Sequence, residues 1–521
     1  MTARKSFPVA IAQLNGIAGD LEGNAEKILQ TARKAADAGA RLLVTPELAL
    51  VGGRVGALAD NGEFLRRAAA CLDALTGTLS EVRIPVVLGT LHQTNEGVRS
   101  ALVLVDSGQP VRTLSLRQLD HAGPGTASTV RLGGNALRVS LGCDECLRSE
   151  QGEFAADICV DMEPFCGADP LEQHPAKTGQ NARPRLWVNA AGGFDGGVYL
   201  GGSSLTDASA RLVSRLRWFE EDFAVADLFE AGDGDHAFRK PERLEMLYGA
   251  LVAATRDYVL KNGFKAVTLG LSGGVDSAFV ATIAADALGP QNVHCVMMPT
   301  RFTAGQSVND ATEFVKRRGF PYVVTPIEPL FEAFLAALSP AFENRPWDVT
   351  EENLQARVRG MLLMAYSNKF GRLVLTTGNK SECAVGYSTL YGDTAGAFAP
   401  ISDVLKTDVW ALCRWRNAQA GGPVIPETII DRAPSAELRE GQTDQQSLPP
   451  YEVLDAIIRG YVERRETAGE IAKSGIDEKL VRKVIGMIHR AEYKRRQCPP
   501  GPRVSSVSFA SGWCYPLGIK I

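Results

Sequence analysis

The stretch LGLSGGVDSA, Leu269–Ala278, decides how the second half of the chain folds. It starts as an apolar run typical of a buried strand, and the alanine-rich sequence after it predicts a helix. Gly273 and Gly274 let backbone N–H groups turn inward, and Ser272 and Ser277 add hydroxyl donors where that helix begins. The stretch therefore predicts a strand–turn–helix unit that cradles a phosphate group.

A carboxylate inside this turn narrows the chemistry. Asp276 would repel a bare phosphate, but it fits if a Mg²⁺ ion lies between the two. Neither the Walker pattern nor the dinucleotide glycine pattern is present. The stretch resembles the pyrophosphate loop of ATP pyrophosphatases, which split ATP into AMP and pyrophosphate while adenylating a substrate oxygen. The resemblance implies ATP and Mg²⁺ as cofactors, with ATP contacts from Gly270, Ser272, Gly273, Gly274, Asp276 and Ser277.

Outward from this unit, the sequence predicts two domains. From Pro8 to about Leu228, short β-like runs alternate with helical stretches, a rhythm typical of a layered α/β domain. Glu230–Glu242 gathers Gly, Asp and Pro without apolar periodicity and predicts a linker, followed by an amphipathic helix over 243–262. We therefore expect domains at 1–235 and 236–521.

Composition limits the broad class of protein. The 521 residues exceed what one hydrophobic core usually supports, and they are 45% hydrophobic and 22% charged with a net charge of −4. This balance gives no support for binding a polyanion such as nucleic acid. The first residues lack the apolar core of a signal peptide, and no later run is apolar enough to predict a membrane span. We expect a cytoplasmic protein with reduced thiols.

Three further stretches narrow the substrate: EENLQARVRGMLLMAYSNK (Glu351–Lys369), LTTGNKSECAVGYSTLYGD (Leu375–Asp393) and AEYKRRQCPPG (Ala491–Gly501). Together with SGGVDSA they resemble NAD⁺ synthetase. The resemblance implies conversion of deamido-NAD⁺ to NAD⁺: the nicotinate carboxylate is adenylated, pyrophosphate leaves, and ammonia then displaces AMP. The same stretches disfavour another ATP pyrophosphatase, such as GMP or asparagine synthetase. A non-catalytic homologue would need a broken pyrophosphate loop, and this loop is intact.

The resemblance also implies roles for single residues. It places Thr377 and Lys406 on ATP, and Asn353, Glu382 and Lys494 on deamido-NAD⁺, with Glu382 as a second metal carboxylate beside Asp276. The neighbouring Arg495 and Arg496 are expected to be solvated charges. Self-association through this domain, at least to a dimer, is also implied.

The first domain resembles a nitrilase-like glutaminase, the module that releases ammonia from glutamine in many NAD⁺ synthetases. The matching stretches are GIAGDLEGNAEKI (Gly16–Ile28), LLVTPELAL (Leu42–Leu50), VNAAGGFDGGVYLGGSS (Val188–Ser204) and FEEDFAVADL (Phe219–Leu228). The implied architecture is a four-layer αββα sandwich, followed by a doubly wound parallel-sheet domain that carries the pyrophosphate loop at strand carboxyl ends.

The glutaminase family uses a catalytic Glu, Lys and Cys. Glu47 matches the glutamate, and Cys143, in LRVSLGCDECL, matches the cysteine by its order along the chain. Three other readings of Cys143 and Cys146 are a zinc site, a redox pair and two small buried residues. Cys159 lies one strand later and is expected to belong to the core.

The lysine has no match. Leu116 stands where it is expected, and Asp120 stands where the family shows a proline. Arg112 or Arg117 could supply a cation, although a guanidinium differs in geometry from an ammonium. Without a fixed cation the tetrahedral oxyanion loses a stabilising partner.

The predicted glutamine pocket departs from the family as well. Glu163 stands in place of a serine, and Asp169 in place of a basic residue, so both would repel the α-carboxylate of glutamine. We therefore predict an impaired glutaminase and a synthetase that uses free ammonia. The alternative is a fully glutamine-dependent enzyme with an unorthodox amidase site.

Overall fold

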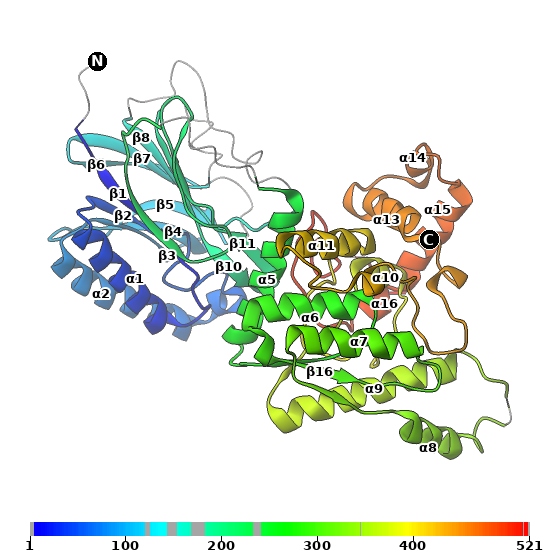
Figure 1. The fold of residues 1–521 in the computed structure, drawn as a ribbon. Coiled ribbons are helices and arrows are strands. Elements are labelled where there is room, and N and C mark those ends of the chain that lie inside the picture. Colours follow the sequence, from blue (N-terminus) through cyan, green and yellow to red (C-terminus); the bar gives the residue numbers. More distant parts are fainter. Residues whose placement is uncertain are drawn as a thin grey trace. The chain divides into compact units, whose positions relative to one another are not determined.

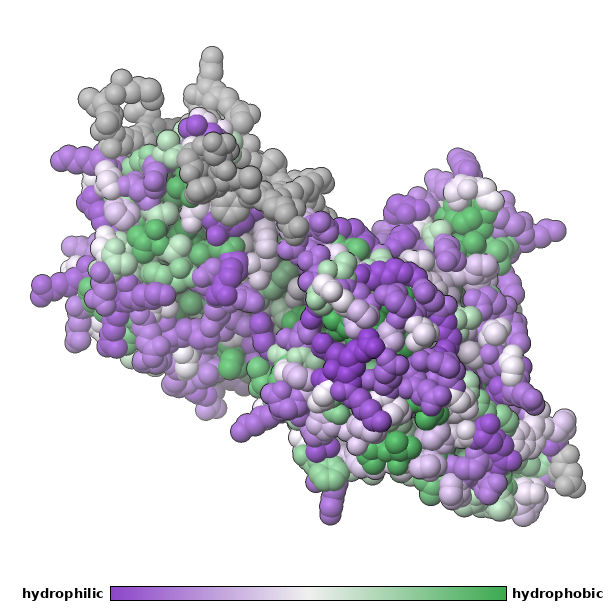
Figure 2. All heavy atoms as spheres, viewed as in Figure 1, coloured by the Kyte–Doolittle hydropathy of each residue, from purple (hydrophilic) through white to green (hydrophobic). Residues whose placement is uncertain are grey.

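The computed structural model describes residues 5–119, 125–142, 154–167, 183–232, 241–343, 345–513 and 515–518. The chain forms two compact units, Met1–Glu242 and Arg243–Ile521 (Figure 1). The predicted boundary at 235/236 falls within residues 233–240, which lie outside the described residues, so it stays a prediction. No helix in the described part of the chain is long and apolar enough to cross a membrane. Hydrophilic side chains predominate on the face that Figure 2 shows.

The first unit contains two six-stranded sheets. The first sheet has the order β14-β1-β2-β3-β4-β5, with β14 at Asp222–Asp227, β1 at Pro8–Gln13, β2 at Leu42–Val44, β3 at Val86–Thr94, β4 at Gly97–Val105 and β5 at Arg112–Gln118. The second has the order β13-β12-β9-β8-β7-β6, with β13 at Leu212–Arg215, β12 at Ser204–Thr206, β9 at Arg185–Asn189, β8 at Ala156–Asp161, β7 at Asn135–Leu141 and β6 at Ala127–Leu132. The strands β10, Ala191–Phe194, and β11, Gly197–Leu200, form a separate hairpin.

The two sheets pack face to face because alternate residues of their strands are apolar. Ile11 and Val44 of the first sheet share one buried cluster with Val139 and Ile158 of the second. The other face of the first sheet packs against helices α1, Leu21–Asp37, and α2, Gly62–Val82. This α/β sandwich confirms the predicted fold class. Residues 143–153 and 168–182, between β7, β8 and β9, lie outside the described residues.

Strand β5 carries an irregularity that matters for the site. Leu102 of β4 pairs with Ser115, but the next residue, Val103, pairs with Thr113, so Leu114 is an extra residue in β5. Such a bulge shifts the side-chain alternation by one position and is common beside active sites. From Ser115 onward, odd-numbered residues of β5 point to one face and Leu116 to the other.

The second unit is built on a parallel sheet of order β17-β16-β15-β18, with β17 at Tyr322–Val324, β16 at Val293–Met297, β15 at Val267–Gly270 and β18 at Leu373–Val374. Its longer helices are α5 (Arg243–Lys261), α6 (Val275–Leu288), α7 (Gly305–Arg318), α8 (Glu328–Leu338), α9 (Val349–Phe370), α11 (Lys406–Gln419), α13 (Tyr451–Ile458) and α15 (Glu478–Arg490). The shorter ones are α10 (Lys380–Val385), α12 (Glu427–Ile430), α14 (Ala468–Ala472) and α16 (Glu492–Arg495), with a π-helical turn at Arg459–Glu463.

The order of these strands places the ligand-binding edge. The chain passes from β15 outward through β16 to β17 and then returns to β18 on the other side of β15. In open parallel sheets, ligands bind at the carboxyl ends of the two strands where the order reverses. Here these strands are β15, which leads into LSGGVDS, and β18, which leads into Thr376 and Thr377.

Candidate active site

The turn after β15 is a compact, internally hydrogen-bonded loop. Gly274 N–H donates to Ser272 Oγ over 3.2 Å, and Ser277 Oγ donates to the Gly274 carbonyl over 3.0 Å. Gly273 has a φ of +83°, and a Cβ there would collide with the Ser307 backbone at the start of α7. Only glycine fits this position. The tight turn that it allows leaves the backbone N–H groups of the loop close to the N-terminus of α6, where an anion can bind.

One cation lies between two carboxylates beside this turn. Lys406, the first residue of α11, contacts Asp276 Oδ2 through its Nζ, and Nζ lies 3.5 Å from Glu382 Oε1. The Lys406 side chain is 2% exposed, and both carboxylates are 18% exposed. Burial opposes the charge of Lys406, but the two carboxylates raise its pKa above the ordinary value. Burial raises the pKa of Glu382 to about 8, while Lys406 counteracts that shift.

A short helix brings Glu382 to this position. Asn379 caps α10: its side-chain oxygen accepts from Glu382 N–H over 3.0 Å, and Glu382 Oε2 accepts from Asn379 N–H over 3.3 Å. This reciprocal capping box fixes the start of the helix. Asn379 Nδ2 also donates to Asp276 Oδ1 over 3.2 Å, which ties the capped turn to the pyrophosphate loop.

The two carboxylates suit a Mg²⁺ ion. Mg²⁺ usually takes one or two protein carboxylates and completes its shell with water and substrate phosphates. Asp276 and Glu382 are joined by the same lysine at the edge of a cavity. No cluster of three or more His, Cys, Asp or Glu side chains that could hold a metal occurs among the described residues. A metal here would therefore need a ligand to supply further oxygens.

A cavity of about 500 Å³ collects most of the residues that the sequence singled out in this unit. Its lining includes Gly270, Ser272, Gly274, Asp276, Ser277, Asn353, Thr377, Glu382, Lys406 and Lys494. Gly273 lies beneath the loop, against Ser307. The segments come from distant parts of the sequence, and the parallel sheet brings them together at one edge.

The other predicted ligand-binding residues have partners within the protein. Asn353, on α9, accepts from Thr389 Oγ1 over 2.7 Å. Lys494, on α16, donates to the carbonyls of Gly386 and Ser388 over 2.8 and 2.6 Å. Lys494 therefore fixes the backbone that follows α10 while it lines the cavity.

One expectation for this region is wrong. Arg495 is not a solvated charge, because its side chain is 5% exposed and it pairs with Glu492 over 2.7 Å. It also donates to the Ala384 carbonyl over 2.7 Å, at the end of α10. Arg496 is about half exposed, as expected. The helical spacing alone could not distinguish the two, because the α10 carbonyls that Arg495 also binds are far away in the sequence.

Sequence reasoning missed the residues that the loop after α12 contributes to the cavity. Arg432 Nη1 donates to Ser307 Oγ over 2.7 Å and to the Gly273 carbonyl over 3.3 Å. Glu437 accepts from the same Ser307 hydroxyl over 2.6 Å. The only signal was the long polar loop Ala433–Pro450, in which Glu437 also accepts from Ala304 N–H before α7 and the Leu438 carbonyl accepts from Gln355 of α9.

The first unit holds a second cation between two carboxylates. Arg117 contacts Glu47 Oε2 through its Nη2, which also donates to Asp161 Oδ1 over 2.9 Å. The three side chains are at most 11% exposed. Burial and the charge of Asp161 raise the pKa of Glu47, whereas Arg117 opposes that rise.

The bulge in β5 explains why Arg117, and not its neighbour, faces Glu47. Leu116, where the lysine was expected, lies on the opposite face of the strand after the shift at Leu114. A Cβ on Gly142 would lie 3.0 Å from Arg117 Nη1, so the guanidinium packs against the residue before Cys143. Cys143 itself lies outside the described residues, as do Asp120, Cys146 and Asp169.

The remaining predictions for this unit concern three residues. Cys159 is fully buried in β8, beside Trp187. Arg112 is exposed at the start of β5 and donates to the Thr129 carbonyl over 3.4 Å, away from Glu47. Glu163 N–H donates to Asn189 Oδ1 over 2.8 Å, just after β8.

Comparison with known proteins identifies both units. The family described as "NAD synthase" matches residues 247–498, and the family described as "Carbon-nitrogen hydrolase" matches residues 8–162. Glutamine-dependent NAD(+) synthetases from Acinetobacter baylyi and Thermotoga maritima are 38% and 37% identical, each over 98% of both chains.

Solved structures agree in fold. A glutamine-dependent NAD⁺ synthetase from Acinetobacter baumannii, in complex with ADP, is 34% identical over 98% of both chains with a TM-score of 0.74. A glutamine-dependent NAD(+) synthetase from Cytophaga hutchinsonii is 18% identical with a TM-score of 0.83 and shows the shared fold alone. The chain therefore belongs to the family of two-domain, glutamine-dependent NAD⁺ synthetases, which are ligases that form a carbon–nitrogen bond.

Proposed function

We propose that the second unit converts deamido-NAD⁺ to NAD⁺ by adenylating the nicotinate carboxylate with ATP and passing it to ammonia. One observation supports this most strongly. A single cavity joins a phosphate-cradling turn, a cation between two carboxylates, and the segments around Asn353 and Lys494. Its volume of about 500 Å³ is typical of a ligand-binding site, and its lining brings the segments assigned to the two substrates together, so that the reacting oxygen and phosphorus could meet.

Different residues of the cavity would bind different parts of the two substrates. The turn at Ser272, Gly274 and Ser277 would bind the departing pyrophosphate through N–H and hydroxyl donors at the helix N-terminus. Lys406 would neutralise phosphate charge at the same edge of the cavity. Thr377 follows β18 and would contact ATP, while Asn353 and Lys494 would orient deamido-NAD⁺.

Asp276 and Glu382 would hold Mg²⁺. A bound Mg²⁺ neutralises phosphate charge and stabilises the charge that develops on the leaving pyrophosphate. In the protein alone, Lys406 supplies the positive charge that the two carboxylates need. Metal binding would remove any proton from Glu382, because a coordinating carboxylate must be ionised.

For the nitrogen source we propose ammonia, with the glutaminase of the first unit impaired. The sequence holds no lysine between Lys34 and Lys177, so no ammonium side chain from this stretch can stabilise the oxyanion of a thioester-forming step. Arg117 is bound to both Glu47 and Asp161, and Glu47 is the residue that would accept the thiol proton. The attraction of Arg117 favours the ionised form of Glu47 and so opposes part of the rise that burial gives to its pKa.

One observation favours the second candidate, a glutamine-dependent enzyme in which Arg117 replaces the lysine. Arg117 is buried, lies beside Glu47 and packs against Gly142, the residue before Cys143. An arginine keeps its charge at all physiological pH values and can donate several hydrogen bonds at once. Such a site would hydrolyse glutamine with an unusual cation.

The test compares nitrogen sources. Purified full-length protein with ATP, Mg²⁺ and deamido-NAD⁺ should form NAD⁺ and AMP with ammonium, and far less with glutamine. Equal rates with glutamine, lost in Cys143→Ala but kept with ammonium, would favour the second candidate. No NAD⁺ from either source would refute the synthetase assignment.

We also propose self-association through the second unit. β17 is an edge strand, and Tyr322, Val323 and Val324 are all exposed. Helices α8 and α9 expose further apolar side chains, among them Phe334, Val349, Met361, Met364 and Phe370. An exposed apolar edge of this kind is usually covered by another chain. Light scattering of the full-length protein should give at least a dimer, and Met361→Glu should weaken it; a monomer would refute the proposal.

A further inference from the structure

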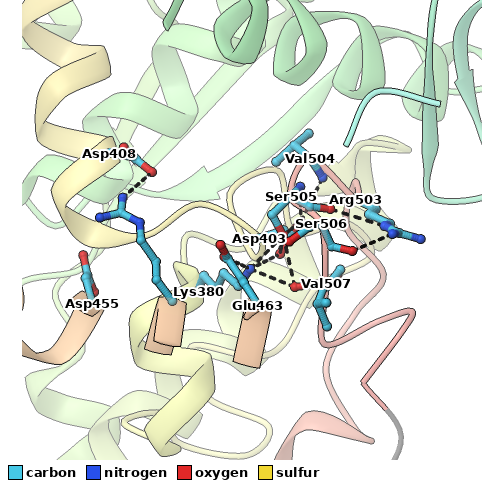
Figure 3. A network of polar contacts seen from close by, with 12 residues as sticks. Lys380, Asp403, Asp408, Asp455, Glu463, Arg503, Val504, Ser505, Ser506 and Val507 are labelled. Carbon is cyan, nitrogen blue, oxygen red and sulfur yellow. Dashed lines mark hydrogen bonds and ion pairs between the residues drawn. The ribbon is translucent and has the colours of Figure 1, made fainter. Parts of the chain in front are cut away.

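Lys380 is a buried charge of the second unit that the chemistry proposed above does not use. It is fully buried, and it is the first residue of α10, between Asn379 and Ser381. Its Nζ lies 2.7 Å from Glu463 Oε1, 3.0 Å from Asp403 Oδ1 and 2.7 Å from Ser505 Oγ. A fourth acceptor, the Val507 carbonyl, is 2.9 Å away (Figure 3).

These partners come from three separate segments. Asp403 precedes α11, Glu463 ends the π-helical turn, and Ser505 and Val507 belong to a turn at 503–507. The 503–507 turn is itself held by Asp403, which accepts from Val504 N–H over 2.8 Å and from Ser505 N–H over 2.9 Å. Figure 3 shows Lys380, Asp403 and Glu463 converging on this turn.

The residue after Lys380, Ser381, links α10 to α11 and α13. Ser381 Oγ donates to Asp455 Oδ1 over 2.5 Å, and it accepts from Lys406 N–H over 2.9 Å. Asp455 also accepts from Thr407 N–H over 2.9 Å, at the start of α11. Lys380 and Ser381 thus attach the beginnings of both α10 and α11, which carry Glu382 and Lys406.

A buried charge cluster is rarely the most stable choice for a core. Replacing such a cluster with apolar residues of similar size is often neutral or stabilising, so a gain in stability does not explain Lys380. A charge with fixed partners does specify one geometry, because any other arrangement leaves a buried charge without compensation. α10 has only six residues, too few to hold its own orientation.

From this geometry we infer that Lys380 is a positioning residue: with Asp403, Glu463 and the 503–507 turn, it sets Asn379 and Glu382 against Asp276 and Lys406. The inference rests on the proposed function, because its consequence is the rate of NAD⁺ formation. It adds that the 503–507 turn, which does not line the cavity, controls the reaction through Lys380.

The test is a variant that keeps the volume of the cluster and removes its charges, Lys380→Met/Asp403→Asn/Glu463→Gln, in the full-length chain. With saturating substrates and ammonium, kcat should fall by about tenfold or more, because displacing reacting groups by even about 1 Å is costly. The matched control is Tyr248→Phe, which removes a 2.5 Å hydrogen bond to Asp286 in another buried cluster of this unit. It should lower the thermal midpoint and leave kcat unchanged.

A triple variant that folds and keeps the wild-type kcat would overturn the inference. If the triple variant does not fold, single variants test the inference instead. Ser505→Ala should lower kcat. Lys380→Arg should keep more activity than Lys380→Met. Amide hydrogen exchange over 379–385 should rise in Ser505→Ala and stay unchanged in Tyr248→Phe. If the wild type forms no NAD⁺, the proposed function fails, and the exchange result alone then supports or overturns the role of Lys380.

Discussion

Each unit of the chain holds a buried cation between two carboxylates at its predicted catalytic site, and these two clusters differ in what they can do. In the first unit, Arg117 joins Glu47 and Asp161; in the second, Lys406 joins Asp276 and Glu382. Arg117 is a planar donor that binds two partners at once and never loses its proton. A lysine is a mobile point charge that can move aside for a metal or a phosphate.

Their surroundings differ in the same sense. Lys406 and both of its partners line the cavity of about 500 Å³, so ligands can reach and rearrange this cluster. Glu47 has no exposed side-chain surface in the described structure, and Arg117 and Asp161 have little. The same set of charges therefore has two uses. In the second unit, Lys406 can give up its carboxylates to a metal or a phosphate, whereas in the first unit Arg117 holds Glu47 and Asp161 in place.

The largest expected effect comes from removing the fixed cation. Arg117→Met leaves Glu47 and Asp161 buried without compensation, so it should destabilise the first unit by about 3–5 kcal/mol. Denaturant unfolding of the full-length protein measures this loss. Arg112→Met, an exposed arginine of the same strand, is the control and should change stability by less than about 0.5 kcal/mol. Equal effects of the two variants would mean that Arg117 is not held as described.

The second effect concerns the exchangeable cluster. Asp276→Asn removes a carboxylate from the pyrophosphate loop, and ammonium-dependent NAD⁺ formation should fall by about 10²–10³-fold, the usual cost of one electrostatic contact to a transition state. Asp431→Asn, in an exposed ion pair with Arg414, should leave the rate unchanged. A small effect of Asp276→Asn would exclude it as a metal or phosphate contact.

The bulge in β5 allows a more specific test, with a smaller expected effect. Arg117→Lys places an ammonium beside Glu47 and should raise glutamine hydrolysis, by roughly tenfold if one hydrogen bond to the oxyanion is regained. Leu116→Lys, the change that the sequence pattern suggests, points to the opposite face of the strand and should give no gain. Glutamate release measures both. A gain from Leu116→Lys alone would contradict the register at Leu114.

The smallest effect is on pH dependence. Glu47 must be ionised to accept a proton from a thiol, and burial with Asp161 raises its pKa. Any glutamine hydrolysis should therefore decrease as the pH is lowered through that raised pKa, by at most about tenfold per pH unit for one proton. Glutamate release, followed directly across pH, measures this slope. If the rate of glutamine hydrolysis stays constant until the pH reaches the ordinary pKa range of a glutamate, Arg117 keeps Glu47 ionised.

Local sequence patterns predicted what depends on neighbouring residues. The turn in LGLSGGVDSA follows β15 and opens α6, and the helix predicted over 243–262 is α5, Arg243–Lys261. The two-sheet fold of the first unit is likewise confirmed. These features follow from apolar periodicity and from glycine positions that few other residues can occupy.

Tertiary contacts could not be predicted in this way. Counting along β5 gave Leu116, because an extra residue in a strand leaves no mark in the sequence. Lys380 stood inside a motif without a role, since its acceptors lie at Glu463, Ser505 and Val507, far along the chain. The roles of the residues around the cavity stay predictions until the variants are measured.

The attachment of α10 to the 503–507 turn has a consequence for synthesis. The pyrophosphate loop, α10 and α11 all leave the ribosome before Ser505 and Val507 are made. Domains generally fold as they emerge, from the N-terminus onward. Until the 503–507 turn arrives, the ammonium of Lys380 lacks two of its four acceptors. A nascent chain would thus carry every residue of the cavity and still be unable to hold them in register, so catalytic competence would arrive late in translation.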